Sequence, residues 1–219
     1  MKTRMLCVFI VLSVLALAIS GLASAETYNI KFGLSNGIEV PENDCEATFA
    51  LAFKDYLETN SNGAITVDLY PNKQLGNATE MMNGVAAGTI EMCVVNSNSF
   101  ASIYPDSMAL ACPGLFASES EVDAVMNSEW GREFFGKLAE ATNCFVITAR
   151  SNGMRCFTCS TKELTTVDTA KGVTFRVMES PVCVRMVESL GANAVPMAGS
   201  EMYTAMQNGT VDGQENPIG

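Results

Sequence analysis

Histidine is absent from this 219-residue sequence, which excludes the side chain used most often as a general base and as a zinc ligand. Basic residues are also few: 13 Lys and Arg stand against 24 Asp and Glu, and the formal net charge is −11. We expect no nucleic-acid partner and no anionic membrane partner, because both are bound through basic surfaces. The sequence also lacks a Gly-rich phosphate loop, a G-x-S-x-G elbow and a dinucleotide fingerprint, and we expect no cofactor and no metal site.

Residues 1–25 resemble a secretory signal peptide, with a charged start, an apolar stretch and a small-residue cleavage site. Lys2 and Arg4 supply the charge, and Ala23-Ser24-Ala25 is the small-x-small site. Cys7 lies inside the apolar stretch, so a lipoprotein anchor is not indicated. Cleavage would leave 11 basic and 24 acidic residues, a net charge of −13, on an exported chain. The alternative is an uncleaved membrane anchor. Beyond this segment no apolar run is long enough to cross a bilayer.

Seven cysteines follow this segment, and an odd number cannot pair completely within one chain. Cys156 and Cys159 form a C-x-x-C pair, but the surrounding residues resemble a strand, whereas redox C-x-x-C pairs begin a helix. Zinc would require a second C-x-x-C pair or histidines, and the sequence has neither. We therefore interpret the cysteines as structural or incidental thiols.

Strand-like and helix-like segments alternate along the rest of the chain. We expect strands at 28–34, 65–70, 90–95, 144–150 and 173–177, and helices at 41–60, 77–87, 120–141 and 181–190. This alternation with short connections predicts an α/β fold with an open, mostly parallel sheet.

A change of pattern near Arg150 divides the chain into two blocks. The residues before it form a complete βαβαβ-like unit, and Ser151-Asn152-Gly153 resembles a crossing into a second unit. We expect a two-lobed fold, with lobe I at residues 26–152, lobe II at residues 153–219 and a ligand cleft between them. Residues 216–219 resemble a turn with nothing after it to close the second unit. We therefore expect a truncated chain with an incomplete lobe II, and a compact natural end is the alternative.

Arg176 stands inside an otherwise apolar, β-branched strand at residues 173–177. Alternation puts Thr174 and Arg176 on the same face of that strand. If the face is exposed, Arg176 is an ordinary surface charge, and if it faces the cleft, Arg176 is a carboxylate clamp. A buried guanidinium costs free energy unless an anion meets it, and its fork can make two parallel hydrogen bonds to a carboxylate.

Two further polar residues have both a structural and a ligand-binding interpretation. Arg155 is either a surface residue at a strand end or a second cation for the same ligand. Asn216 is either part of a simple loop or a donor to a ligand oxygen. Asp212 and Glu215 flank the same turn, but neither has a partner base in the sequence, so general acid catalysis is disfavoured.

A set of motifs along the chain resembles one family. The earlier ones are Lys31-Phe32-Gly33, Tyr70-Pro71 with Gln74-Leu75-Gly76, Gly88-Thr89-Ile90-Glu91-Met92, Pro113-Gly114-Leu115-Phe116 and Gly153-Met154-Arg155. The most specific ones are the strand from Lys171 to Val177, Leu190-Gly191-Ala192, Ser200-Glu201-Met202-Tyr203 and the segment from Gly209 to Pro217. Together they look like the substrate-binding protein of a tripartite ATP-independent periplasmic (TRAP) transporter, of the DctP-like family.

The resemblance implies two α/β lobes that close around an organic acid, with Arg176 forming the main salt bridge to the ligand carboxylate. It implies supporting contacts from Arg155 and Asn216. Positions that match other cleft-lining residues of the family are Ser35, Asn96 and Met178. The family's binding proteins continue well past the Gln-Glu-Asn-Pro motif, which agrees with the expected truncation.

Two departures from the family pattern bear on the ligand. Ala198-Gly199 stands before the Ser-Glu-Met-Tyr motif, where many relatives have an aromatic residue that would pack against the ligand. Asn96 stands where sialic-acid binders carry a glutamate, which argues against sialic acid. Dicarboxylates, keto acids, aromatic acids and sugar acids remain open.

We therefore predict a periplasmic receptor that binds a small carboxylate, delivers it to the membrane subunits of a TRAP permease and acts as a monomer without catalysis. One alternative is the receptor of an ATP-driven transporter or of a sensory system. Another is an exported enzyme on the same fold, such as a lyase that uses Asp212 or Glu215.

Overall fold

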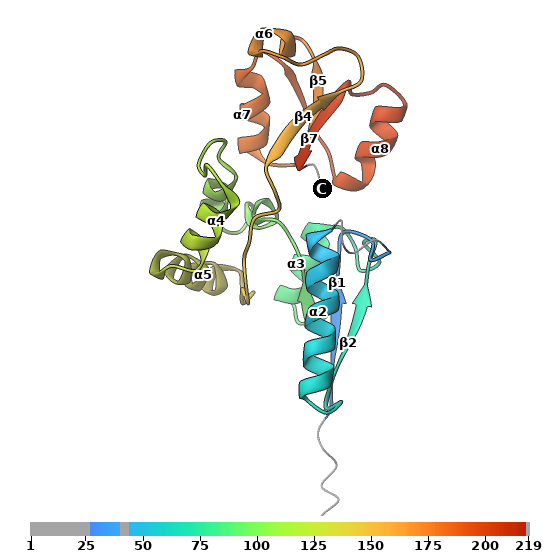
Figure 1. Ribbon diagram of the computed structural model, residues 1–219, viewed down its shortest axis with the longest axis vertical. Helices are drawn as coiled ribbons and strands as arrows, with labels where there is room; N and C mark the ends of the chain where they lie inside the picture. Colours follow the sequence, from blue (N-terminus) through green and yellow to red (C-terminus); the bar gives the residue numbers. More distant parts are fainter. Residues whose placement is uncertain (1–26, 40–43, 218–219) are drawn as a thin grey trace, which may run out of the picture.

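The described residues form two β-sheets, each with its own helices, and a further helical region with α4 (Glu119–Met126) and α5 (Glu129–Thr142) (Figure 1). The computed structural model describes residues 27–39 and 44–217, and the expected signal peptide lies outside them. Among the described helices, none is long and apolar enough to cross a membrane. In the same residues, all seven cysteines are free thiols, and no three His, Cys, Asp or Glu side chains are arranged to hold a metal ion.

The first sheet is parallel, with the strand order β2-β1-β3. Its strands are β1 (Tyr28–Gly33), β2 (Ile65–Tyr70) and β3 (Met92–Cys93), and its helices are α2 (Cys45–Asn60) and α3 (Ala78–Ala86). Apolar residues of α2 pack on β1 and β2, and the ring of Phe32 lies 5.9 Å from that of Phe53. The register pairs Tyr28 with Ile65 and continues to Gly33 with Tyr70.

Both helices begin at a residue whose side chain caps the helix. The Asp44 carboxylate accepts a hydrogen bond from the Ala47 amide at 2.9 Å, ahead of α2. Asn77 and Glu80 form a reciprocal capping box at the start of α3. These caps satisfy amide groups that a helix leaves free at its N-terminus, so helix initiation is encoded locally.

A helical region follows the first sheet. It contains the 3₁₀ helices η2 (Ser97–Phe100) and η3 (Pro105–Ala111) and the helices α4 (Glu119–Met126) and α5 (Glu129–Thr142). We predicted one helical stretch over 120–141, and the structure divides it at Asn127 and Ser128. The Ser128 hydroxyl accepts from the Gly131 amide and starts α5 as a new helix.

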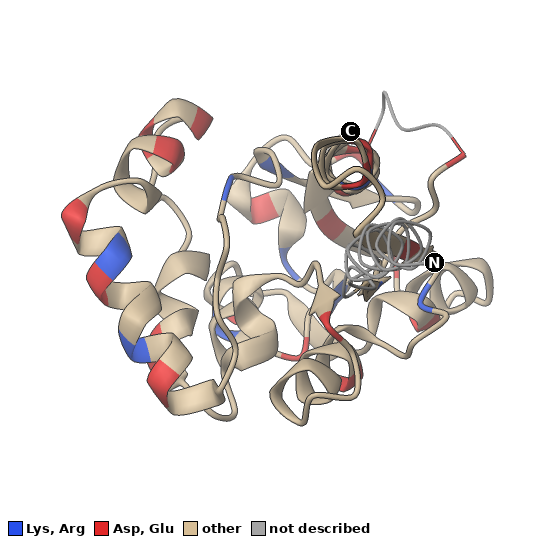
Figure 2. Ribbon diagram, turned by 90° about the horizontal axis from the view of Figure 1, so that it is seen from below, with Lys and Arg blue, Asp and Glu red and all other residues tan. Residues whose placement is uncertain are grey.

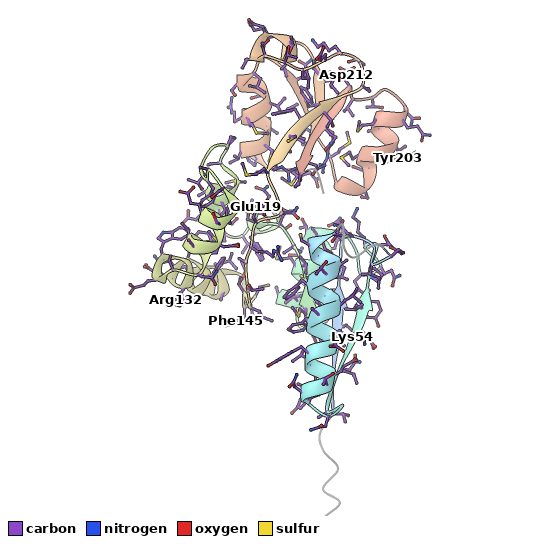
Figure 3. The ribbon with its side chains drawn as sticks, viewed as in Figure 1. Lys54, Glu119, Arg132, Phe145, Tyr203 and Asp212 are labelled. Atoms are coloured by element: carbon purple, nitrogen blue, oxygen red, sulfur yellow. The ribbon has the colours of Figure 1, made fainter. Side chains whose placement is uncertain are left out.

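The predicted strand at 144–150 is wrong, because the chain there forms no ladder with any described strand. Phe145 is 85% exposed and Ile147 is 59% exposed (Figure 3). Apolar alternation alone does not make a strand, which exists through hydrogen bonds to a neighbour. The predicted strand at 90–95 shrinks for the same reason to Met92–Cys93, the two residues that pair with β1.

The second sheet has the strand order β4-β7-β5-β6. Its elements are β4 (Arg155–Cys159), α6 (Val167–Ala170), β5 (Thr174–Val177), α7 (Pro181–Ser189), β6 (Asn193–Pro196), α8 (Gly199–Gln207) and β7 (Gly213–Pro217). β4 and β7 are antiparallel, whereas β5 runs parallel to both β6 and β7. Helices α7 and α8 lie on either side of this sheet (Figure 1). The core between β5 and α7 includes Phe175, Val177 and Val187.

The segment from Gly213 to Pro217, which we interpreted as a turn, is an inner strand of this sheet. The Asp-Gly and Asn-Pro pairs suggested a turn, but β7 fits between β4 and β5 because Gly213 has no side chain. A Cβ atom at that position would lie 2.2 Å from the Thr158 carbonyl oxygen. The predicted turn at residues 216–219 is therefore wrong for Asn216 and Pro217, the two of these residues that the structure describes.

The predicted α/β class is confirmed, with mostly parallel pairing in both sheets. The segment between α5 and β4 leads from one group of elements to the other (Figure 1). The lobe boundary at residues 152 and 153 falls in this segment and stays a prediction.

Candidate ligand-binding site

β5 places Arg176 in the interior of the second lobe. Its backbone pairs with Val195 of β6 on one side and with Gln214 of β7 on the other. Phe175 and Val177 point into the core under α7, so alternation directs Arg176 to the opposite face, towards α8. The residue is only 4% exposed.

The Arg176 guanidinium is held by neutral acceptors. Its Nε and Nη2 atoms donate to the Met197 carbonyl oxygen at 3.1 and 2.8 Å, and Nη1 lies 4.0 Å from Met202 Sδ. Within residues 27–39 and 44–217, no carboxylate forms an ion pair with it. Burial lowers the pKa of Arg176, because desolvation disfavours the charged form, and the charge of Glu215 opposes this shift.

Arg155 has a partner in β7 instead. Its Nε lies 2.6 Å from Glu215 Oε2, and its Nη2 donates to Glu215 Oε1 at 3.1 Å, to the Glu215 carbonyl at 2.7 Å and to Asn216 Oδ1 at 2.9 Å. The Glu215 side chain is 3% exposed and that of Arg155 is 33% exposed. The antiparallel β4–β7 pairing brings these groups together although 60 residues separate them.

Asn216 bonds to Arg155 and lies near Arg176 through the shared contact of both side chains with the Met202 sulfur. Its Oδ1 accepts from Arg155, and its Nδ2 donates to Gln214 Oε1 and to Met202 Sδ, the latter at 3.4 Å. Asp212 joins β7 to β5, because its amide donates to the Thr174 carbonyl at 2.7 Å and its Oδ2 accepts from the Thr174 amide at 2.9 Å (Figure 3). The structure thus brings Arg176, Arg155 and Asn216 together at one site.

The other three predicted site residues lie outside this cluster. Ser35 follows β1, and its amide donates to the Glu46 carboxylate. Asn96 is exposed and precedes η2 without capping it. Met178 follows β5, and its Sδ lies 3.8 Å from Nδ2 of Asn98 in η2. Contact between the lobes therefore involves Met178, while Ser35 and Asn96 lie beyond the carboxyl ends of β1 and β3.

Sequence reasoning did not single out Glu215 as a partner of Arg155, and it did not single out Met202 or Asn98. Met202 lies in the quoted Ser-Glu-Met-Tyr motif, so its position was visible in the sequence but its contacts were not. Asn98 also donates to Cys183 Sγ at 3.8 Å, which adds a second contact between η2 and the second lobe.

One shallow hollow of about 500 Å³ lies elsewhere, at the start of α7, where Glu179, Arg185 and Pro196 are among its lining residues. Neither Arg176 nor Asn216 lines it, so the candidate site rests on the geometry around Arg176. Figure 2 shows acidic positions scattered over many elements, with the fewer basic positions among them. At ordinary salt the screening length is about 8–10 Å, so distant negative charge has little effect on a buried guanidinium.

The fold is that of a two-lobed α/β protein, with a buried arginine in its second lobe. The family model for bacterial extracellular solute-binding protein family 7, DctP, matches residues 36–219. The chain belongs to this family, which confirms the predicted family.

Two of the relatives by sequence are described as binding proteins. The chain is 33% identical over 204 residues to the 2,3-diketo-L-gulonate-binding periplasmic protein YiaO of Escherichia coli, covering 93% of this chain and 62% of that protein. It is 31% identical over 215 residues to the C4-dicarboxylate-binding periplasmic protein DctP of Rhodobacter capsulatus, covering 98% and 63%.

Solved structures show the same similarity. The sugar acid binding protein DctPAm of Advenella mimigardefordensis, in complex with galactonate, matches with a TM-score of 0.82 and 30% identity over 88% of this chain and 60% of that one. A TRAP periplasmic solute binding protein of Pseudomonas aeruginosa with bound L-malate matches with a TM-score of 0.79 and 26% identity over 86% and 64%. The chain spans about three fifths of the length of these relatives.

Proposed function

We propose that this protein is a periplasmic solute receptor that binds a small organic acid through Arg176 and delivers it to a TRAP-type membrane permease. The observation that carries the proposal is the 4% exposed guanidinium without a carboxylate partner among the described residues. The Met197 carbonyl and the Met202 sulfur satisfy hydrogen bonds but carry no net charge. An anionic ligand would supply the missing charge.

A carboxylate fits this site better than other anions do. The guanidinium fork matches the two oxygens of a carboxylate, and each charge-assisted hydrogen bond contributes roughly 1.5–3 kcal/mol. Relatives of known structure are described with galactonate, β-D-galacturonate, D-erythronate, L-malate and orotic acid; all of these have a carboxylate, and the first four also have at least one alcohol hydroxyl. We infer that the ligand of this chain is a hydroxylated carboxylic acid of the same kind.

Supporting contacts complete the proposed site. Asn216 would donate to the ligand, while Arg155 acts mainly through Glu215 and holds Asn216 in place. β7 points towards the first lobe, and the carboxyl end of β1 faces the second lobe (Figure 1). The other three predicted site residues, Ser35, Asn96 and Met178, would also contact the ligand.

The wider assignment follows from the family. We propose a signal peptide at residues 1–25, lobe I at 26–152 and lobe II at 153–219, acting in the periplasm as a monomer. Closure of the two lobes around the acid would be a hinge motion stabilised by contacts from both lobes. No catalytic step is proposed.

Calorimetric titration with galactonate, β-D-galacturonate and L-malate tests this function. Arg176→Ala removes two charge-assisted bonds worth about 3–6 kcal/mol, so we expect the affinity to fall at least 100-fold. Arg176→Lys keeps the charge without the bidentate geometry and should weaken binding about tenfold or more. Arg185→Ala is the matched control, because this arginine is 85% exposed in α7 and should leave affinity unchanged.

Circular dichroism of each variant excludes unfolding as the cause. An Arg176→Ala variant that binds acids as the wild type does would refute the assignment. Analysis of the recovered acid by mass spectrometry distinguishes a receptor from an enzyme, because a receptor returns the acid unaltered.

A further inference from the structure

Met202 of α8 meets the two donors that we assign to the ligand. Its thioether sulfur accepts from Asn216 Nδ2 at 3.4 Å and lies 4.0 Å from Arg176 Nη1. The residue is half-buried, whereas the adjacent Tyr203 is 74% exposed (Figure 3). One sulfur atom therefore lies where donors from β5 and β7 converge.

We propose that Met202 is a specificity-determining residue whose sulfur occupies the position of the ligand carboxylate until the ligand displaces it. This inference rests on the proposed function, because it assigns the same two donors to an acid. It adds that the chain itself supplies a weak, replaceable acceptor at that position.

The hydrogen bonds within the second lobe restrict the position of the carboxylate to the Nη1 side of the guanidinium. Arg176 uses Nε and Nη2 for the Met197 carbonyl, and Asn216 uses one amide hydrogen for Gln214. Arg176 Nη2 keeps one further hydrogen for a ligand, and Arg176 Nη1 and Asn216 Nδ2 carry the hydrogens that face Met202. A carboxylate oxygen between them would overlap the sulfur, so Met202 has to move when the acid binds.

A methionine suits this role chemically. Its sulfur is a weak acceptor, so the donors are satisfied only partly and are released at small cost. The unbranched side chain has three rotatable bonds and can turn aside without a backbone shift. A leucine lacks the acceptor, and a glutamine carries a much stronger one in a side chain of similar length.

The neighbouring turn of α8 provides space for this movement. Gly199 lies three residues before Met202 and therefore on the same helix face. A Cβ atom at residue 199 would lie 3.7 Å from Arg176 Nη2, an ordinary contact distance. A side chain at residue 199 would narrow the space beside the guanidinium. Residues 199 and 202 together therefore limit the size of the group that the acid can place there.

Two substitutions with opposite expected effects test the proposal. Calorimetry uses whichever of galactonate, β-D-galacturonate and L-malate the wild type binds most tightly. Met202→Leu removes the competing acceptor and should tighten binding about threefold. Met202→Gln places an amide oxygen between the donors and should weaken binding at least tenfold. Met206→Leu, one turn further along α8, is the control and should change affinity less than twofold.

A spectroscopic readout follows the displacement in the wild-type protein. With ¹³C-labelled methionine methyl groups, the Met202 signal is the one missing from Met202→Leu. We expect it to shift during the titration and to saturate together with the heat of binding. A Met202 signal that stays in place while the acid binds would overturn the inference.

The outcomes separate this inference from the proposed function. If Arg176→Ala abolishes binding but the leucine and glutamine variants behave alike, Met202 is only a packing residue and this inference is wrong. If the wild-type protein binds none of the acids, or if Arg176→Ala binds normally, both proposals are wrong. Both proposals are supported if Met202→Leu binds the acid more tightly than the wild type and Met202→Gln binds it more weakly.

Discussion

Replacing Glu215 with glutamine should destabilise the second lobe more than any surface charge change does. Glu215 is 2% exposed and receives two side-chain hydrogen bonds from Arg155, at 2.6 and 3.1 Å. Glutamine keeps one acceptor oxygen but loses the charge, so one charge-assisted bond and the ion pair disappear. Arg176, which also experiences the charge of Glu215, loses compensation at the same time.

The magnitude follows from the exposure of the two partners. Breaking a fully buried ion pair by removing one partner costs about 3–5 kcal/mol. The Arg155 side chain is 33% exposed, so water solvates part of its charge and reduces this cost. We expect a loss of about 2–3 kcal/mol in the free energy of unfolding.

Urea unfolding followed by far-ultraviolet circular dichroism measures this loss. Trp130, the single tryptophan, lies in α5 and would report on the first lobe instead. Glu188→Gln is the control, because Glu188 pairs with Arg185 at 3.3 Å on an exposed helix face and should change stability by less than about 0.5 kcal/mol. A Glu215→Gln variant as stable as this control would refute the reasoning.

Two further predictions concern the sheets. Gly213→Ala should cost at least about 3 kcal/mol, since its Cβ would lie 2.2 Å from the Thr158 carbonyl oxygen, whereas Gly136→Ala, on the exposed side of α5, should gain about 0.5–1 kcal/mol. Urea unfolding of both variants checks this pair, and equal stabilities would contradict it. Burial, with a smaller contribution from Cys144, raises the pKa of the Cys93 thiol to about 12. The unfolded thiol loses its proton first as pH rises above 9, so wild-type stability should fall by about 1 kcal/mol between pH 8 and pH 10 through this group. Cys93→Ala should lack this part of the decline, and a variant with an unchanged pH profile would show that Cys93 has no such role.

Local sequence patterns were sufficient for the elements whose signals are local. The helical patterns of α2 and α3 and the alternation of β1, β2 and β5 predicted these elements closely. The motifs along the chain also predicted the family. Arg176 was identified because one charge in an apolar strand is unusual, and that signal requires no knowledge of the fold.

Only the tertiary structure shows which strands pair with each other and which strand faces are covered. Residues 144–150 have a strand-like pattern but no neighbour, whereas Gly213–Pro217 has a turn-like pattern and lies between two strands. A strand depends on hydrogen bonds to partners that are distant in sequence, so local pattern cannot decide either case.

The same limit applies to the candidate site. Alternation showed that Arg176 and Thr174 share a face but not whether that face is covered, and only the position of α8 decides that Arg176 is buried. The sequence also left open whether Arg155 is a free cation, because its partner Glu215 is 60 residues away. The sequence by itself determined which residues carry charge and where the helices and strands with local signals form. The packing of β7 against β4 and β5, and of α8 beside them, decided which charges meet a partner, since contact between distant residues arises only when the chain folds.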